Sequence, residues 1–258
     1  MKPTLALSDL NIVVTRPREQ AVKLAQRITA AGGQAILFPL LEINPVADPQ
    51  PLRALVARLA EYQLAVFISP NAVRYGMQAI LAKAAMPHTL AVATVGQGSA
   101  QALRDYGISK IIAPQQRFDS EALLALPELQ SVAGQRVVIF RGEGGRELLG
   151  DTLKARGAIV DYAACYQRVK PQLDIAMLLA ARPDAITVTS SEALGYLDTM
   201  LREQLPNETA RTRLMAVPLF VPHSRIAEAA HQQGWQVVVA TGTGDDGLLE
   251  SLLKWARH

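Results

Sequence analysis

Residues 64–76 read LAVFISPNAVRYG, and the pattern changes from strand-like to helix-like at the centre. The apolar run at 64–69 is typical of a strand that is covered on both faces. A Ser-Pro-Asn turn begins at Ser69, and the spacing that follows it predicts a helix. The stretch is therefore a strand–turn–helix unit that places a hydroxyl at the opening of the helix.

The chain contains a second unit of this kind, AITVTSSEALGYL at 185–197. Around both units, four segments of the first half recur in the same order in the second half. The matched pairs are 11–43 with 136–168, 64–73 with 185–194, 90–107 with 215–234, and 110–126 with 236–253. Any α/β chain resembles itself, because strand–helix units share one pattern, but a duplication explains the common order better.

Apolar runs alternate with helical patterns along the whole chain. The segments that we predict as strands are 11–15, 35–43, 64–69, 90–96, 110–114, 136–142, 158–168, 185–190, 214–221 and 236–241. Most are continuous apolar runs, as in parallel sheets flanked by helices. The chain has 258 residues, and 50% of them are hydrophobic, which is enough for two cores. We therefore predict an α/β fold with two parallel-sheet domains.

The first helical segment, REQAVKLAQRITAAGG, illustrates the periodicity. Its Gly32 and Gly33 are expected to end the helix. The residues that fall near one face of this helix are Val22, Ala25, Ile28 and Thr29.

Two predicted strands differ from the others. FPLLEINP (38–45) and YAACYQRVKP (162–171) follow the first helix of each copy, and each ends near a proline. Both are longer and more polar at their ends than a buried parallel strand. They could cross between the domains as a two-stranded connector, near 38–44 and 162–168, or they could be ordinary sheet strands.

The charge balance is mild, because 26 Lys and Arg against 23 Asp and Glu give a formal net charge of +3. No basic block alternates with aromatic residues, which disfavours nucleic-acid binding. The single cysteine, Cys165, excludes a disulfide within the chain and agrees with a reducing compartment. There is no signal-peptide core and no apolar run of about 18 residues, so we expect a cytoplasmic protein without membrane contact.

Hydroxyl, glycine and arginine side chains gather where the predicted strands end. These turns read TRPR (15–18), SPNA (69–72), VGQGS (95–99), RGEGGR (141–146), TSSE (189–192), PHSR (222–225) and TGTGDD (241–246). Each should open a helix whose free N–H groups bind anions. Any single turn is explained better by helix capping alone. Together, the turns of two domains predict a site for a polyanion.

Other sites are excluded by the sequence. Residues 242–247 match a dinucleotide fingerprint, but no strand and no ribose-binding acid follow, and Asp245 and Asp246 would repel a pyrophosphate. There is no P-loop. The four histidines are scattered and Cys165 lies in an apolar segment, so we expect no metal and no cofactor.

The combination of several segments resembles uroporphyrinogen-III synthase, in order and over nearly the whole chain. The segments are VVTRP (13–17), FPLLEI (38–43), SPNAV (69–73), RGEGGRELLGDTL (141–153) and CYQR (165–168). The resemblance implies two flavodoxin-like parallel-sheet domains, a tandem duplication, joined by a two-stranded β connector with a cleft between them. It implies a discontinuous domain 1 of 1–40 plus 168–258 and a domain 2 of 41–167.

The reaction of this family is the cyclisation of hydroxymethylbilane to uroporphyrinogen III with loss of water and inversion of the last ring. No cofactor is used. The substrate is a linear tetrapyrrole with eight carboxylates, which a cleft of helix N-termini, hydroxyls and arginines would suit. The resemblance also implies a monomer and a transient handover from hydroxymethylbilane synthase.

Site residues follow from the resemblance, position by position. Tyr166 in CYQR is the expected proton donor to the leaving hydroxyl, or else an interface tyrosine that only packs. Arg146 is an expected carboxylate ligand, or else a partner of Glu147 or solvent. At the turn before Ser224, FVPH departs from the glycine form at 95–96. The expected substrate-binding residues are Arg16, Ser69, Ser99, Arg141, Gly144, Arg146, Ser190, Ser191 and Ser224.

Two other functions remain open from the sequence. The chain could be a non-enzymatic two-lobed anion-binding protein, although it has neither a signal peptide nor a helix-turn-helix appendage. It could also be an inactive synthase-like paralogue, which the presence of Tyr166, Ser99 and Ser224 disfavours.

Overall fold

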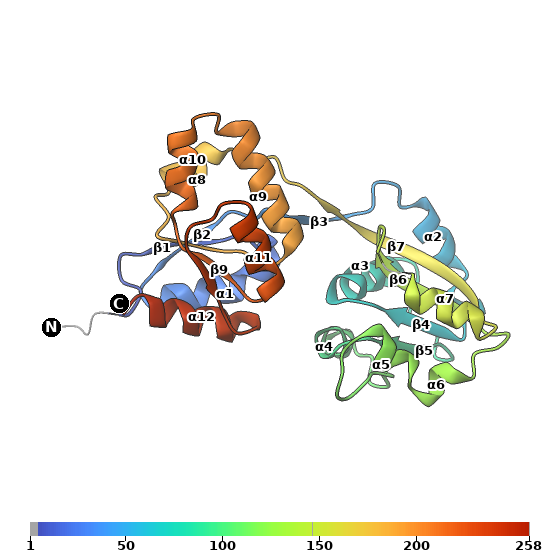
Figure 1. Cartoon of the computed structure of the whole chain (residues 1–258). Coiled ribbons are helices and arrows are strands. Elements are labelled where there is room, and N and C mark those ends of the chain that lie inside the picture. Colours follow the sequence, from blue (N-terminus) through green and yellow to red (C-terminus); the bar gives the residue numbers. More distant parts are fainter. Residues whose placement is uncertain (1–4, 146, 258) are drawn as a thin grey trace. The chain divides into compact units, whose positions relative to one another are not determined.

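The computed structural model describes residues 5–145 and 147–257, and the chain divides into two compact units (Figure 1). Unit 1 combines the two ends of the chain, Met1–Glu42 and Val169–His258, whereas unit 2 is the continuous middle segment Ile43–Arg168. Each unit is built around its own five-stranded sheet. The α/β class predicted from the alternating pattern is therefore confirmed, with mainly parallel strands in both sheets.

The sheet of unit 1 has the strand order β10-β9-β8-β1-β2, and all four neighbouring pairs are parallel. Its strands are β1 (Asn11–Val14), β2 (Gln34–Leu37), β8 (Ala185–Thr187), β9 (Leu219–Val221) and β10 (Val238–Ala240). Its helices are α1 (Arg18–Ala30), α8 (Ile175–Ala180), α9 (Ser191–Gln204), α10 (Glu208–Met215), α11 (Ser224–Gln232) and α12 (Gly244–Trp255).

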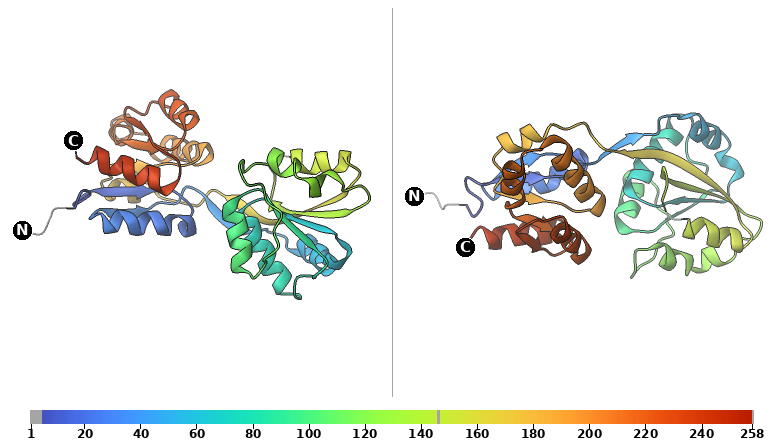
Figure 2. Two further views of the ribbon diagram at one scale, coloured as in Figure 1. Left: turned by 90° about the horizontal axis from the view of Figure 1, so that it is seen from below. Right: turned by 45° about the horizontal axis from the view of Figure 1, so that its top comes forward.

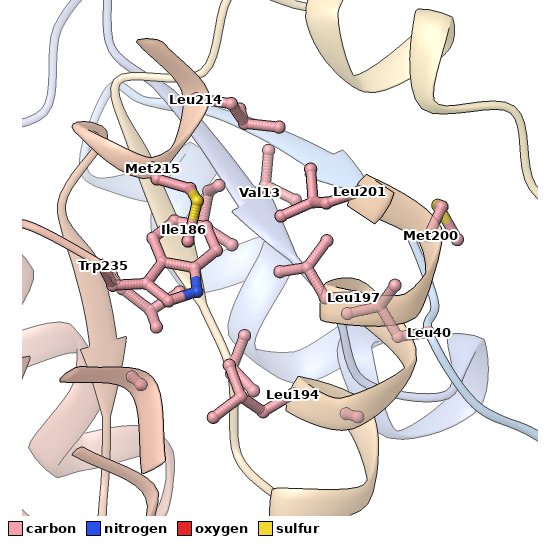
Figure 3. Packing of buried hydrophobic residues seen from close by; sticks show 14 of the residues in the cluster. Val13, Leu40, Ile186, Leu194, Leu197, Met200, Leu201, Leu214, Met215 and Trp235 are labelled. Atoms are coloured by element: carbon pink, nitrogen blue, oxygen red, sulfur yellow. The ribbon is translucent and has the colours of Figure 1, made fainter. Parts of the chain in front are cut away.

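Helices cover both faces of this sheet (Figures 1 and 2). Because successive strand side chains point to opposite faces, Ile12 and Val14 pack against α1 and α12, whereas Val13 packs against the helices of the other face. Figure 3 shows that second core, where Val13 and Ile186 of the sheet meet Leu197 and Leu201 of α9. Burial on both faces explains why the central strands β1, β8 and β9 are mainly apolar.

The sheet of unit 2 has the order β3-β7-β6-β4-β5, and the pairs from β7 to β5 are parallel. Its strands are β3 (Glu42–Pro45), β4 (Leu64–Phe67), β5 (Ala91–Thr94), β6 (Arg136–Gly142) and β7 (Ile159–Val169). Its helices are α2 (Gln50–Ala57), the 3-10 turn η1 (Leu59–Glu61), α3 (Pro70–Leu81), α4 (Gln97–Asp105), α5 (Ser120–Leu124), α6 (Pro127–Gln130) and α7 (Leu148–Ala155).

Unit 2 also has a core on each side of its sheet. Helices α2, α3 and α4 contribute to one core, and α5, α6 and α7, drawn in green in Figure 2, contribute to the other. On the α3 side, the rings of Phe67 and Phe140 stack with their centroids 4.6 Å apart. Gly76 of α3 lies on this pair, since a Cβ there would be 2.8 Å from the Phe140 ring. The close approach fixes α3, and with it the turn at Ser69, against the sheet.

Three strand predictions need correction. Segment 35–43 is not one strand, because β2 ends at Leu37 and β3 begins at Glu42; Pro39 between them has no N–H for a ladder. Segment 110–114 contributes only a single bridge, between Ile112 and Ala93.

The third correction concerns 214–221, whose first residues belong to a helix. Helix α10 continues to Met215, and its start is capped by the Asn207 side chain, which accepts two backbone N–H groups. The strand begins only at Leu219. An apolar run that closes a helix and opens a strand reads as one strand in the sequence.

The predicted face of α1 is partly wrong. The buried residues are Ala21, Leu24 and Ile28, whereas Val22 is 49% exposed. The buried stripe is set by the angle at which the helix meets the sheet, and the apolar spacing leaves that angle open. The predicted stop is confirmed, because α1 ends at Ala30 and Gly32 has a φ of 93°, which favours glycine.

Candidate functional site

The predicted site residues lie near the carboxyl ends of the strands, and they fall into one group in each unit. In parallel sheets these ends share one edge, which is where ligands bind in open α/β sheets. Arg146 lies outside the described residues. Unit 2 holds Ser69, Ser99, Arg141, Gly144 and Tyr166, and unit 1 holds Arg16, Ser190, Ser191 and Ser224.

Tyr166 lies on β7 beside the end of β6, where the register of the two strands changes. Arg141 is opposite Ala164, but Gly142 is opposite Tyr166, so Cys165 is the extra residue of a bulge. Bulges bend a strand and redirect its side chains. A Cβ on Gly142 would lie 2.7 Å from the Tyr166 ring, so glycine is what leaves room for the ring.

The Tyr166 hydroxyl contacts the helix opening at Ser69. The two hydroxyl oxygens are 3.2 Å apart, and Ser69 Oγ also accepts the Ala72 backbone N–H at 3.0 Å. Tyr166 is 2% exposed, whereas Ser69 is partly exposed. The structure therefore joins the predicted proton donor to a predicted substrate-binding hydroxyl, and the serine is the more accessible of the two.

Tyr75 holds the other side of the Tyr166 ring. The two ring centroids are 6.0 Å apart, and the Tyr75 hydroxyl donates a hydrogen bond of 2.7 Å to the Ile43 carbonyl. Tyr75 is in α3 and Ile43 is in β3. Helix α3 thus anchors β3 and supports the Tyr166 ring through one side chain.

Arg141 is committed to the loop that follows β6. Its Nε donates to the Gly144 carbonyl at 3.1 Å, its Nη2 donates to the same oxygen, and its Nη1 pairs with Glu147 at 2.9 Å. The guanidinium also lies 4.9 Å from the centroid of the Tyr162 ring. A buried arginine with these partners would have to release them before it could bind a substrate carboxylate.

The neighbours of Arg141 have altered acidities. Burial raises the pKa of Tyr162 to about 12. The Tyr162 hydroxyl and the Arg141 guanidinium hold the pKa of Glu147 below its usual range. Glu147 therefore stays ionised and keeps its pair with Arg141 under mildly acidic conditions.

The glycines of this loop have backbone conformations that other residues rarely adopt. Gly144 has a φ of 70° and Gly145 a φ of 110°. A Cβ on Gly144 would meet nothing within 4 Å, whereas a Cβ on Gly145 would lie 2.9 Å from Arg141 Nη2. Gly144 is thus the exposed tip of the loop, and its carbonyl, not its N–H, is already engaged.

Ser99 is almost fully buried, although a substrate-binding side chain has to be accessible. It is in the first turn of α4 and is 2% exposed. The exposed part of this turn is Gln97 and Gly98, which line a cavity of about 670 Å³ together with Arg104 and Gln115. A Cβ on Gly98 would lie 3.5 Å from the ring of Pro70, the first residue of α3. The N-termini of α3 and α4 are therefore neighbours.

In unit 1, Arg16 already has an acidic partner. Its guanidinium forms an ion pair with Asp245 in the first turn of α12, and the two side chains are 16% and 17% exposed. The sequence presents Asp245 and Asp246 only as residues that repel a pyrophosphate. Asp245 is in addition a neutralising group, so Arg16 is not a free cation.

The serines of unit 1 differ from one another. Ser190 caps α9 by accepting the Ala193 N–H at 3.1 Å, as Ser69 caps α3. The Ser191 Oγ is buried and has no hydrogen-bond partner among the described residues. Ser224 is the exposed first residue of α11, and the capping position before it, His223, makes no side-chain cap. The first N–H groups of α11 therefore have no side-chain cap.

Several residues of these two groups were not predicted. Gly142, Tyr75, Tyr162, Glu147 and the pairing role of Asp245 emerge only from the fold. Arg16 and Asp245 are 229 positions apart, and Ser69 and Tyr166 are 97 apart. No local spacing could have indicated these contacts.

Among residues 5–145 and 147–257, no three His, Cys, Asp or Glu side chains gather closely enough to hold a metal ion. Over the same residues, no helix is long and apolar enough to cross a membrane. Cys165 is buried, and burial raises the pKa of its thiol to about 12, so it remains protonated at neutral pH.

Comparison with known proteins gives consistent matches over most of the chain. The sequence model of the family described as uroporphyrinogen-III synthase HemD matches residues 22–250. Uroporphyrinogen-III synthase of Escherichia coli K12 is 37% identical over 249 residues, which is 94% of this chain and 100% of that protein. Uroporphyrinogen-III synthase of Synechococcus elongatus is 32% identical over 256 residues, with 96% of each chain covered.

Solved structures share the fold at low sequence identity. A mutant uroporphyrinogen III synthase of Thermus thermophilus matches with a TM-score of 0.58 and 17% identity, over 96% of this chain and 98% of that one. Uroporphyrinogen-III synthetase of Helicobacter pylori 26695 matches with a TM-score of 0.57 and 16% identity, over the same shares.

These matches give no support to a non-enzymatic anion-binding protein. The family match covers most of the chain, and the two relatives at 37% and 32% identity cover nearly all of it. The chain therefore belongs to the uroporphyrinogen-III synthase family, enzymes of porphyrin biosynthesis that cyclise hydroxymethylbilane.

Proposed function

We propose that this protein closes hydroxymethylbilane to uroporphyrinogen III, with Tyr166 as the proton source and with the strand-end side chains of each unit as carboxylate-binding groups. The observation that carries this proposal is the contact of 3.2 Å between the Tyr166 and Ser69 hydroxyls at the opening of α3. It places an ionisable group beside a helix N-terminus, where negative charge is stabilised.

The chemistry asks little of the protein beyond positioning and one proton. The pyrrole nitrogen lone pair expels the hydroxyl, which leaves as water once it is protonated. The azafulvene cation that remains is attacked by the last pyrrole ring, and the ring inverts through a spiro intermediate. Positioning of this kind contributes up to roughly 7–11 kcal/mol, and proton transfer contributes about 10²–10⁴-fold.

Carboxylate binding is assigned to helix N-termini more than to arginines. Arg16 and Arg141 are already paired, with Asp245 and with Glu147. The turns that open α4 and α11 are free of side-chain caps. Their N–H groups and the helix dipole favour anions. Ser69, Ser190 and Ser224 would add hydroxyl donors, whereas the buried Ser191 Oγ would first have to become accessible. Gly144 would bring the backbone of its loop close to the substrate.

We further propose that the two units arose by duplication and exchange of strands. The order β10-β9-β8-β1-β2 matches, under the repeat pairing of the sequence, the order of Ile112, β5, β4, β6 and β7 in unit 2. In this pairing each sheet takes strands from both copies. β3 and β7 are hydrogen-bonded neighbours, which supports the two-stranded connector, with Gln167 Nε2 donating to the Pro45 carbonyl at 3.0 Å.

The cellular part of the proposal is a cytoplasmic monomer that receives its unstable substrate directly from hydroxymethylbilane synthase. Pull-down of that synthase and analytical ultracentrifugation at working concentrations would test the handover and the monomer. Their failure would leave the cyclisation itself untouched.

The experiment that tests the proposal is an isomer assay. Porphobilinogen and hydroxymethylbilane synthase generate the bilane, this protein is added, and the oxidised uroporphyrins are separated by chromatography. Spontaneous closure gives isomer I, so dominance of isomer III establishes the reaction. Tyr166→Phe should then lower the rate of isomer III formation, whereas isomer I alone with folded wild-type protein contradicts the function.

A further inference from the structure

We propose that Ser69, rather than Tyr166, touches the departing hydroxyl, and that Tyr166 supplies the proton from behind it. This inference rests on the proposed function. The first observation is accessibility: Tyr166 is 2% exposed, while Ser69 is partly exposed at the helix opening. A group that donates a proton to a substrate must reach it within about 2.6–3.2 Å. Of the two residues, Ser69 has the greater exposed surface, so it is the one placed to come within this distance of a substrate.

The hydrogen bonds around Ser69 Oγ allow one arrangement that uses all of its capacity. A serine hydroxyl has one O–H to donate and two lone pairs that accept. One lone pair accepts the Ala72 N–H at 3.0 Å, and the second can accept the Tyr166 O–H at 3.2 Å. The Ser69 O–H is then left to donate toward the substrate.

The proton transfer balances without any further reactant. As the C–O bond of the hydroxymethyl group breaks, the Ser69 O–H proton passes to the departing oxygen, which leaves as water. Ser69 takes the phenolic proton of Tyr166 in the same step, so the serine stays neutral. Tyr166 becomes a phenolate until it takes up the proton that the closing pyrrole ring releases.

The surroundings suit a transient phenolate at this point. Ser69 is the capping residue of α3, a helix of 12 residues, so the Tyr166 oxygen lies beside the positive end of its dipole. Gly142 and Tyr75 confine the ring, so the hydroxyl cannot turn away.

Unit 1 lacks such a pair. Ser190 makes the same cap to Ala193, but the residue that matches Tyr166 in the repeat is Leu41, which has no hydroxyl. A helix cap alone therefore does not require a tyrosine. The hydrogen bond between Tyr166 and Ser69 in unit 2 is therefore not needed for the capping of α3.

We call the transfer of a proton from Tyr166 through Ser69 to the substrate the relay. The test separates this relay from the capping of α3 by substituting Ser69 in two ways. Ser69→Thr keeps an acceptor for the Ala72 N–H and keeps an O–H that can pass a proton. Ser69→Asn keeps an acceptor for the cap, but its amide cannot release a proton. The expected result is that kcat falls by roughly 10²-fold or more in S69N and by much less in S69T. KM should change less than kcat in both variants.

Tyr166→Phe and the double variant S69N/Y166F complete a cycle. Because both residues act in one relay, the kcat of the double variant should be no lower than that of the slower single variant. Asp119→Ala, which removes the cap of α5 in the same unit, is the control for loss of a helix cap and should keep its kcat. Thermal unfolding of every variant identifies losses that come from misfolding.

Each of the other outcomes contradicts a particular part of the proposal. Full activity of S69N with a slow Y166F shows that Tyr166 acts directly, and the relay fails. Multiplicative losses in the double variant also reject the relay. Full activity of Y166F removes Tyr166 as proton source, and with it the residue assignment under the proposed function. Absence of isomer III with the wild-type protein rejects the function itself.

Discussion

At the scale of single residues, Gly142 controls the position of Tyr166. A Cβ at this position would lie 2.7 Å from the ring, at the point where the register of β6 and β7 shifts. We predict that Gly142→Ala destabilises the protein by roughly 1–3 kcal/mol, as overpacking does, and lowers kcat as well. Chemical denaturation and the isomer assay measure the two effects.

The matched control is Gly195→Ala in α9, where a Cβ meets nothing within 4 Å. There alanine should stabilise the helix by about 1 kcal/mol, because glycine is the poorer helix former. If both substitutions changed the free energy of unfolding equally, the close approach of Gly142 to Tyr166 would not affect stability.

The burial of the Cys165 thiol predicts that the folded protein loses stability at alkaline pH. Burial raises the pKa of this thiol to about 12, from an ordinary value of 9.0. The folded state favours the neutral thiol, so its contribution is complete below about pH 9 and is lost as the pH rises toward 12. Burial raises the pKa of Tyr162 to about 12, so it acts in a similar window.

The measurement is urea unfolding between pH 8 and 11 for the wild type, Cys165→Ala and Tyr162→Phe. Each variant should have a shallower loss of stability with rising pH, even where its stability at neutral pH is lower. A slope that is unchanged in both variants would contradict the burial of these groups.

At the scale of elements, Arg141 organises the loop between β6 and α7. It binds the Gly144 carbonyl twice and pairs with Glu147, so the loop is held by one side chain. We predict that Arg141→Ala destabilises the protein by roughly 1–3 kcal/mol, since charged hydrogen bonds in a buried setting are lost. Hydrogen exchange in residues 142–145 should accelerate, while β4 and β5 remain protected.

The control for this prediction is Arg202→Ala. Its partner Asp198 lies one turn earlier on α9, and the Arg202 side chain is 67% exposed. Exposed pairs of this kind contribute about 0–1 kcal/mol. A similar loss in both variants would mean that the Arg141 contacts add nothing beyond an ordinary surface pair.

At the scale of the whole molecule, the order of the units along the chain predicts that unit 2 folds by itself more readily than unit 1. Unit 2 is one continuous segment with a core on each face of its sheet, whereas unit 1 needs both ends of the chain. We predict that a fragment of residues 42–169 folds cooperatively by itself. Circular dichroism and a thermal melt would show it, and residues 1–42 alone should remain unfolded.

The same fragment should not form isomer III, because it lacks the strand-end donors of unit 1. Rescue by adding the complementary pieces, 1–42 and 169–258, would show that both groups of donors are needed. Full activity of the fragment alone would remove unit 1 from the proposed site.

The fold class, the helix openings and the family resemblance were all accessible from the sequence. Apolar runs, helix stops such as Gly32 and capping hydroxyls such as Ser69 depend on residues close together in the chain, so their pattern is readable. At segments 35–43 and 214–221 the prediction was wrong because an apolar run continues through a change of element, and at 110–114 because the run forms only one bridge. Pairing between strands, and not composition, decides such boundaries.

The partners of the site residues were beyond the reach of the sequence. Whether Arg16 is free or paired with Asp245 depends on a contact across 229 positions. Tyr166 meets Ser69 because β7 and β4 both flank β6 and a bulge redirects the ring. Local periodicity specifies elements, because it arises from the backbone; sheet order, register and side-chain partners arise only when distant elements pack together.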